Sequence, residues 1–137
     1  MNWADRYIRI PFVDGGRDHF GCDCWGLCRL VYRDILQINL PSYGEIDAKN
    51  LIGIARQMKS GADDGEVWTK VEGIPREFDV CLMTWFGQRA IAHIGVMVDE
   101  RHVLHTEDIA GVSISKINHP HILTRVRAFY RHREMAR

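Results

Sequence analysis

A cysteine at the start of a helical pattern is the first feature with chemical potential. The apolar members of that pattern are Cys24, Leu27, Cys28, Val31 and Ile35, which share one stripe of a helix. Asp23, directly before it, is a typical N-cap. Because the unpaired N–H groups of the first turn and the helix dipole favour a thiolate, we expect a lowered pKa for Cys24. The same N–H groups can bind an oxyanion formed at an attacked carbonyl.

Two histidines lie on adjacent segments with strand-like alternation. In Ala92–Val98, His93, Gly95 and Met97 share one face, and Gly95 is expected to leave open space beside His93. The next strand carries His105. A hairpin centred on Asp99 sets His93 directly opposite His105, whereas a shift of one residue puts the rings on opposite faces. The hypothesis therefore requires a three-residue loop or a bulge between the strands.

Together these side chains predict a triad for nucleophilic catalysis. Cys24 is the nucleophile, His93 the base, and His105 the group that fixes the tautomer of His93. Cys22 is the rival nucleophile, but it precedes the helix and lies off its apolar stripe. We expect the remaining cysteines, Cys28 and Cys81, to pack in the core.

The elements that must position these residues follow one another as helices and then strands. A short amphipathic segment over Trp3–Ile10 and a glycine-containing loop precede the helix that begins at Cys24, and a second helix is expected over Asp47–Ser60. Six strands follow, over 67–71, 78–84, 92–98, 102–106, 112–115 and 125–130. This order predicts a single α+β domain over residues 1–137, with N-terminal helices packed on a small antiparallel sheet.

Composition narrows the classes of function. The chain has 18 basic and 18 acidic residues, so no overall charge favours nucleic acid as a partner. We expect the arginine-rich end, 125–137, to be a solvated strand edge and tail. No apolar run is long enough to insert in a membrane, and the first residues lack the layout of a secretory signal. The four cysteines are not spaced as a disulfide framework and indicate a reducing compartment.

Several motifs resemble the NlpC-type (NlpC and p-sixty) cell-wall cysteine peptidases. Gly21–Leu27 is similar to their nucleophile motif, 92–96 to their histidine strand, and 103–105 to the strand that carries the third member. Asp79–Leu82 resembles the strand before the histidine. The stretches Cys22–Arg33, Leu40–Tyr43 and Arg125–Arg131 resemble the phage-tail branch in particular.

The resemblance implies a papain-like fold and hydrolysis of peptidoglycan stem peptides between D-glutamate and diaminopimelate, with no metal or other cofactor. It also implies a phage or prophage tail component, with tail proteins as partners. Such a protein would be made in the bacterial cytoplasm, and delivery by a virion would explain a cell-wall enzyme without a signal peptide.

Two positions depart from the family pattern. Phe12 stands twelve residues before Cys24, where many members have a tyrosine that helps to hold the oxyanion, and the loss of such a donor can lower the rate by about 10²–10³-fold. Trp25 replaces the serine after the nucleophile and is a candidate for the substrate groove. Asp23 is a candidate substrate contact as well as a cap.

Two other classes of protein stay open. Cys22, Cys24 and Cys28 with His19 form a thiolate-rich cluster that is compatible with a structural metal-binding module, although the cysteine spacing is unusual for one. A catalytically inactive tail-assembly or adaptor protein that keeps the fold is the second alternative. Metal analysis distinguishes the first, and loss of peptidase activity in Cys24→Ala the second.

Overall fold

A computed structural model describes residues 2–40, 67–84, 89, 91–107 and 110–135. Its helical elements are η1 (Trp3–Tyr7), α1 (Cys24–Val31), η2 (Tyr32–Leu36), α3 (Pro120–Leu123) and η4 (Arg133–Met135). Its strands are β1 (Arg17–Asp18), β2 (Gly21–Cys22), β3 (Trp68–Lys70), β4 (Val80–Thr84), β5 (Ile91–Met97), β6 (His102–Glu107), β7 (Gly111–Lys116) and β8 (Val126–His132). The predicted α+β fold is confirmed.

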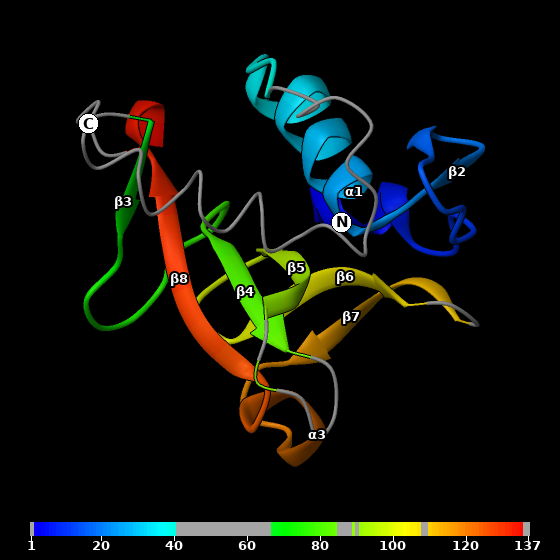
Figure 1. Ribbon diagram of the computed structural model, residues 1–137. Helices are drawn as coiled ribbons and strands as arrows, with labels where there is room; N and C mark the ends of the chain where they lie inside the picture. Colours follow the sequence, from blue (N-terminus) through cyan, green and yellow to red (C-terminus); the bar gives the residue numbers. More distant parts are fainter. Residues whose placement is uncertain (1, 41–66, 85–88, 90, 108–109, 136–137) are drawn as a thin grey trace.

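The larger sheet has six strands in the order β3-β8-β4-β5-β6-β7, and every neighbouring pair is antiparallel. All six predicted strands are present, within a few residues of their expected ends. Figure 1 shows α1 beside one end of this curved sheet and α3 at the opposite end. The strands β5 and β6, which carry the two candidate histidines, therefore lie in the interior of the sheet.

The helix α1 forms where the local signals place it. It begins at Cys24 and Asp23 caps it, as predicted. Its burial is broader than one stripe, because Trp25, Gly26 and Leu30 are buried as well as the apolar stripe. A π-helical segment, η2, continues it to Leu36, and the left-handed residue Gln37 (φ 58°) ends it.

A small hairpin of β1 and β2 leads into α1. Gly15, in the loop just before β1, has a φ of +75°, which glycine adopts without strain. Gly16 lies so close to α1 that a Cβ added to Gly26 would be 2.1 Å from the Gly16 carbonyl oxygen. These glycines let the loop pack directly against the first turn of the helix.

The two faces of the sheet belong to separate apolar clusters. Ile94, Val96 and Val98 of the β5 segment share a core with α1, whereas Met97 belongs to a second cluster with Cys81, Met83, Val103 and Ile122. The predicted alternation along this strand is thereby confirmed.

The arginines near the C-terminus are not all solvated, contrary to expectation. Arg131 makes a bidentate ion pair with the fully buried Asp79, with distances of 2.8 and 2.7 Å. Arg125 is only 3% exposed and pairs with Glu107. Buried charges need such partners, so these arginines are structural parts of β8 and of the segment before it.

Some predictions fall elsewhere in the chain. The helix expected over Asp47–Ser60 lies outside the described residues. The short helix α3 and the 3₁₀ turn η4 were not predicted. Of the helices described, none has the length and apolar character required to cross a bilayer.

Candidate active site

The start of α1 is held by a buried carboxylate. Asp23 accepts a hydrogen bond from the backbone N–H of Gly26 at 2.7 Å and from that of Gly15 at 3.2 Å. Its Oδ1 also lies 2.6 Å from Nη1 of Arg17. Because Asp23 is fully buried and engaged by these partners, the structure places it as a cap and offers no exposed surface for the predicted substrate contact.

The candidate nucleophile occupies the first position of this helix. Cys24 is 1% exposed, and backbone N–H groups of Ile94, Trp25 and Cys24 itself lie close enough to stabilise its thiolate. Burial nevertheless raises the pKa of Cys24 to about 12, and the charge of Asp23 adds to that effect. The predicted lowering is wrong for the resting protein, because loss of hydration outweighs the helix terminus.

The hairpin that carries the histidines has the predicted parity but a different centre. Val96 pairs with Leu104 and Met97 with Val103, so the hairpin is centred on Glu100 rather than Asp99. His93 is therefore not directly opposite His105, contrary to the prediction. The expectation that a shift of the centre by one residue puts the rings on opposite faces is wrong, because such a shift changes each residue's partner by two positions and keeps both side chains on one face. The three-residue turn Asp99–Arg101 is closed by a 2.8 Å bond from the Val98 N–H to the His102 carbonyl.

Gly95 permits close approach and leaves no open space. A Cβ at this position would lie 2.6 Å from Val103 Cγ2, 2.8 Å from the Leu104 carbonyl oxygen and 3.1 Å from His105 Cβ. The expectation of a gap beside His93 is therefore wrong. The absence of a side chain lets β6 pass close over β5 and brings His105 within reach of His93.

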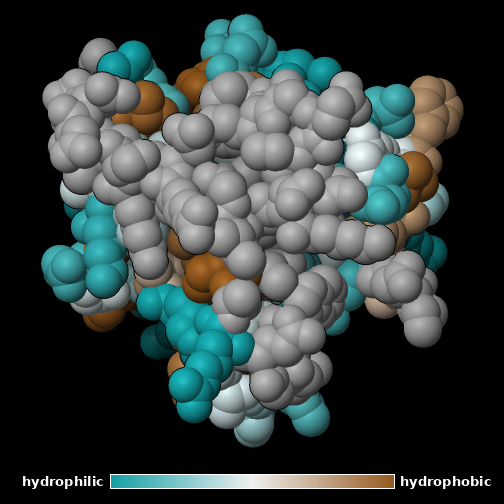
Figure 2. All heavy atoms as spheres, in the orientation of Figure 1, coloured by the Kyte–Doolittle hydropathy of each residue, from teal (hydrophilic) through white to brown (hydrophobic). Residues whose placement is uncertain are grey.

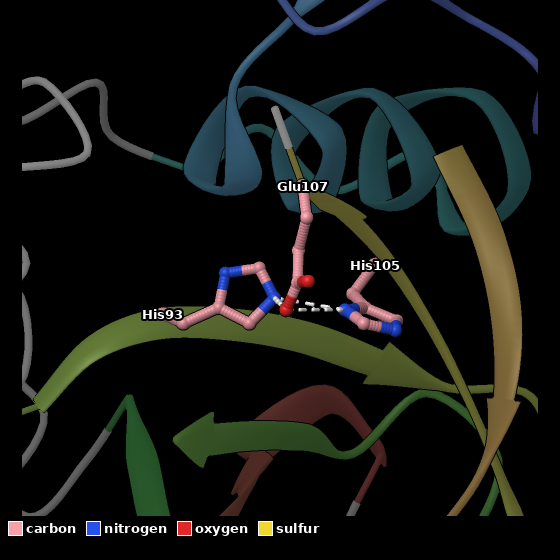
Figure 3. A group of neighbouring side chains, drawn as sticks. All are labelled: His93, His105 and Glu107. Carbon is pink, nitrogen blue, oxygen red and sulfur yellow. Dashed lines mark hydrogen bonds and ion pairs between the residues drawn. The ribbon is translucent and has the colours of Figure 1, made fainter. Parts of the chain in front are cut away.

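The two imidazoles form a direct hydrogen-bonded pair. Nε2 of His93 lies 2.8 Å from Nδ1 of His105, and the ring planes are inclined by 68°. Figure 3 shows the ring of His93 beneath the first turn of α1, with its Nδ1 on the side facing that helix. Burial is the main cause that lowers the pKa of His93 and of His105, and the charge of Arg125 lowers both further. At neutral pH both rings are therefore uncharged at rest.

Three residues outside the predicted triad complete the site. Ser115 Oγ on β7 lies 2.9 Å from Nε2 of His105. Glu107 Oε1 lies 3.5 Å from Nε2 of His93 and 3.7 Å from Nδ1 of His105 (Figure 3). Arg125 donates to the same Glu107 oxygen at 2.7 Å and to the Thr84 carbonyl at 2.8 Å.

The sequence offered one usable signal for Glu107. It lies two residues after His105 on the same strand, so alternation alone places it on the same face. Ser115 and Arg125 had no such signal, because their approach depends on how β7 and the start of β8 pack beside β6 and β4.

The other predicted contacts are placed differently. Trp25 is fully buried in the core, so its indole has no surface for a substrate, contrary to expectation; its backbone N–H is the part near Cys24. Phe12 is partly buried and forms an isolated bridge with Cys22. Val13 in the loop before β1 is 45% exposed, and Phe20 in the turn between β1 and β2 is 90% exposed. Figure 2 shows apolar atoms along the edge of the molecule where the β1–β2 hairpin lies.

The thiolate-rich cluster does not assemble as a metal site. The four cysteines are free and buried, and His19 instead pairs with Asp34 at 2.7 Å. Within the described ranges, the group of potential ligands that converges is His93, His105 and Glu107. Among the other histidines, His132 is only 6% exposed and packs against Tyr32 and Trp68.

A thiol at the mouth of a buried helix, next to a strand that carries a hydrogen-bonded imidazole pair, is the arrangement of a papain-like cysteine peptidase. The model of the NlpC/P60 family matches residues 9–131. The chain therefore belongs to the NlpC/P60 family, whose members are cysteine peptidases and peptidoglycan hydrolases.

Solved structures with the same fold include a Bacillus cereus NlpC/P60 family protein, with a TM-score of 0.66, 18% identity, and coverage of 94% of this chain and 37% of that one. A lipoprotein-like NLP/P60 family protein of Staphylococcus aureus has a TM-score of 0.60 and 19% identity, and the match covers 94% of this chain and 38% of that one. The NlpC/p60 domain of the peptidoglycan hydrolase SagA has a TM-score of 0.58 and 17% identity, and the match covers 92% of this chain and 90% of that one. The chain thus spans less than two fifths of the first two proteins. A search of curated proteins finds no match.

Proposed function

We propose that this protein is a peptidoglycan endopeptidase that cleaves stem peptides with Cys24 as nucleophile, His93 as base and His105 as the residue that orients the base. The observation that carries the proposal is the 2.8 Å contact between His93 Nε2 and His105 Nδ1 on the strands beside the α1 terminus. Family membership supports the class of substrate. We further propose the bond between D-glutamate and diaminopimelate as the one cleaved.

The tautomers needed for this chemistry are compatible with the contacts. If His105 donates its Nε2–H to Ser115, its Nδ1 is an acceptor for the Nε2–H of His93. The Nδ1 of His93 then carries a lone pair on the side of the helix. That lone pair is what a base needs to take the proton of the Cys24 thiol.

The reaction proceeds in two halves. The thiol proton passes to His93 as sulfur attacks the peptide carbonyl, and backbone N–H groups of Cys24 and Trp25 hold the oxyanion. The imidazolium then protonates the leaving amine, which gives a thioester. In the second half His93 takes a proton from water, and hydroxide attack on the thioester releases the acid and restores the thiol.

The resting site must change before this reaction begins. Cys24 is 1% exposed, so a peptide carbonyl reaches its sulfur only when the groups that cover it move. The charge of Glu107, 3.5 Å from Nε2, stabilises the imidazolium once it forms. The proton transfer is therefore coupled to substrate binding rather than completed in the free protein.

We place the protein in a phage or prophage tail, with tail proteins as its partners and the virion as its location. The support is the resemblance of Cys22–Arg33 and Leu40–Tyr43 to the phage-tail branch. Mass spectrometry of purified virions, with non-structural phage proteins as the control, tests this placement. Absence of the protein from intact tails would contradict it.

Digestion of purified sacculi tests the enzymatic proposal. Wild-type protein should release muropeptide fragments whose masses show cleavage after D-glutamate, and Cys24→Ala should release none. Inactivity of both proteins would favour the inactive adaptor, an alternative that Phe12 and the raised pKa of Cys24 keep relevant. Fragments cut at another bond would retain the peptidase and reject the proposed specificity.

A further inference from the structure

We propose that His93, His105 and Glu107 form a Zn²⁺ site that reversibly inhibits the protein. The ion would bind Nε2 of His93, whereas Nδ1 is the ring nitrogen on the side of α1 and the candidate nucleophile. Their ligand atoms are Nε2, Nδ1 and Oε1, and all lie within 4.8 Å of one another. The binding site stands on this geometry alone. Its inhibitory consequence rests on the proposed function.

The distances match the size of a zinc ion. The three separations are 2.8, 3.5 and 3.7 Å. A triangle with these sides has one point about 2.0 Å from every corner, which is the usual length of Zn–N and Zn–O bonds. Slight rotation of the side chains lifts the ion out of the triangle's plane and leaves a fourth position for water, as in zinc sites with three protein ligands.

The type of ligand selects the metal. Two imidazole nitrogens favour Zn²⁺ and neighbouring transition metals over Mg²⁺ and Ca²⁺, which take oxygen ligands. Glu107 is 34% exposed, whereas both histidines are almost completely buried, so the ion enters from the side of Glu107.

The surrounding hydrogen bonds resemble the outer shell of a metal site. Metal-bound histidines usually donate their second N–H to an acceptor, and Ser115 Oγ occupies that place for His105. Ligating carboxylates are usually hydrogen-bonded in turn, and Arg125 supplies that contact to Glu107. A carboxylate oxygen has two lone pairs, so Oε1 can accept from Arg125 and still bind the ion.

Arg125 also sets a limit on affinity. Its guanidinium is buried and lies 2.7 Å from the ligating oxygen, so its charge opposes that of the ion. The site therefore suits a reversible inhibitor better than a permanently bound structural metal.

Occupation of the site disables the base through its tautomer. A neutral imidazole that binds a metal through Nε2 carries its proton on Nδ1. The proton on the Nε2 of His93 exchanges through solvent to Nδ1, with no change in total charge of the ring. Nδ1 then has no lone pair with which to accept the proton of Cys24, and hydrolysis stops until the ion leaves.

Calorimetric titration of Cys24→Ala with ZnCl₂ tests binding without a contribution from the candidate nucleophile. We expect one ion per chain. Adding Glu107→Gln to this protein should weaken binding by at least about tenfold, and adding Ser115→Ala by about tenfold. Adding Glu100→Gln is the matched control, because Glu100 is exposed in the turn of the same hairpin, and it should leave affinity unchanged. Circular dichroism establishes that each variant is folded.

No binding by Cys24→Ala, or equal affinity after Glu107→Gln, would overturn the site. In the wild type, ZnCl₂ should inhibit sacculus digestion and EDTA should restore it. Binding without inhibition of an active enzyme would overturn the inhibitory role. A wild type that cleaves no sacculi contradicts the proposed function, while the titration still decides the metal site.

Discussion

Ser115 on β7 holds His105 from the side opposite His93, with its Oγ 2.9 Å from Nε2 of His105. The two bonds of His105 thus form a continuous chain from Ser115 to His93. Such a chain fixes both rings and selects the tautomer in which His93 can act as a base.

Replacement of Ser115 by alanine should lower kcat by about two- to tenfold, the value of one hydrogen bond of about 0.5–1.5 kcal/mol. KM should change little, because Ser115 is not proposed to contact the substrate. Ser113→Ala is the matched control, since Ser113 lies on the same strand and no bond joins its hydroxyl to either histidine among the described residues. Equal rates for the two variants would show that the Ser115 hydroxyl does not position His105 for catalysis.

The reactivity of Cys24 should depend on pH as that of a buried neutral thiol. Its pKa is raised to about 12. The thiolate fraction then increases about tenfold per pH unit throughout the range below that value, and alkylation by iodoacetamide should follow it from pH 7 to pH 10.

The measurement is the alkylation rate in the absence of substrate, followed by mass mapping of the Cys24 peptide. Cys24→Ala serves to subtract modification of the other cysteines. A rate that is already constant between acidic and neutral pH would show a thiolate–imidazolium pair in the free protein and contradict the expected neutral resting state.

Gly95→Ala should destabilise the fold and disturb the histidine pair. The added methyl group would collide with Val103 and with the Leu104 carbonyl, so β6 has to move away from β5. Overpacking of this kind costs about 1–3 kcal/mol of unfolding free energy. Urea denaturation should show the loss as a lower midpoint, and sacculus digestion should slow at temperatures where the variant is folded. An unchanged midpoint would show that the strands accommodate a side chain here.

Local signals were sufficient to predict α1 and its cap, because Asp23 and the apolar period lie within one short segment. The shared face of His93 and His105 was also predictable, since alternation fixes parity along a hairpin. The centre of that hairpin was not, because sequences around Asp99 and Glu100 permit either turn.

Features that depend on contacts between distant segments could not be predicted from the sequence. Ser115 and Arg125 reach the histidines through the pairing of β7 and the packing before β8, and no local pattern reports such contacts. The direction of the pKa of Cys24 was missed for the same reason, since burial of the sulfur results from tertiary packing. His132 is likewise buried by distant segments, because it packs against Tyr32 of η2 and Trp68 of β3.

In the proposed mechanism the sulfur of Cys24 attacks the substrate carbonyl and His93 accepts the thiol proton. Hydrolysis of a stem peptide containing the D-glutamyl–diaminopimelate bond tests it most directly, with product release followed for wild type, Cys24→Ala, Cys22→Ala and His93→Ala. We predict that Cys22→Ala retains activity, that Cys24→Ala has none, and that His93→Ala is slower by about 10²–10⁴-fold. Hydrolysis by Cys24→Ala at the wild-type rate, or its loss in Cys22→Ala alone with the fold intact, would contradict the account.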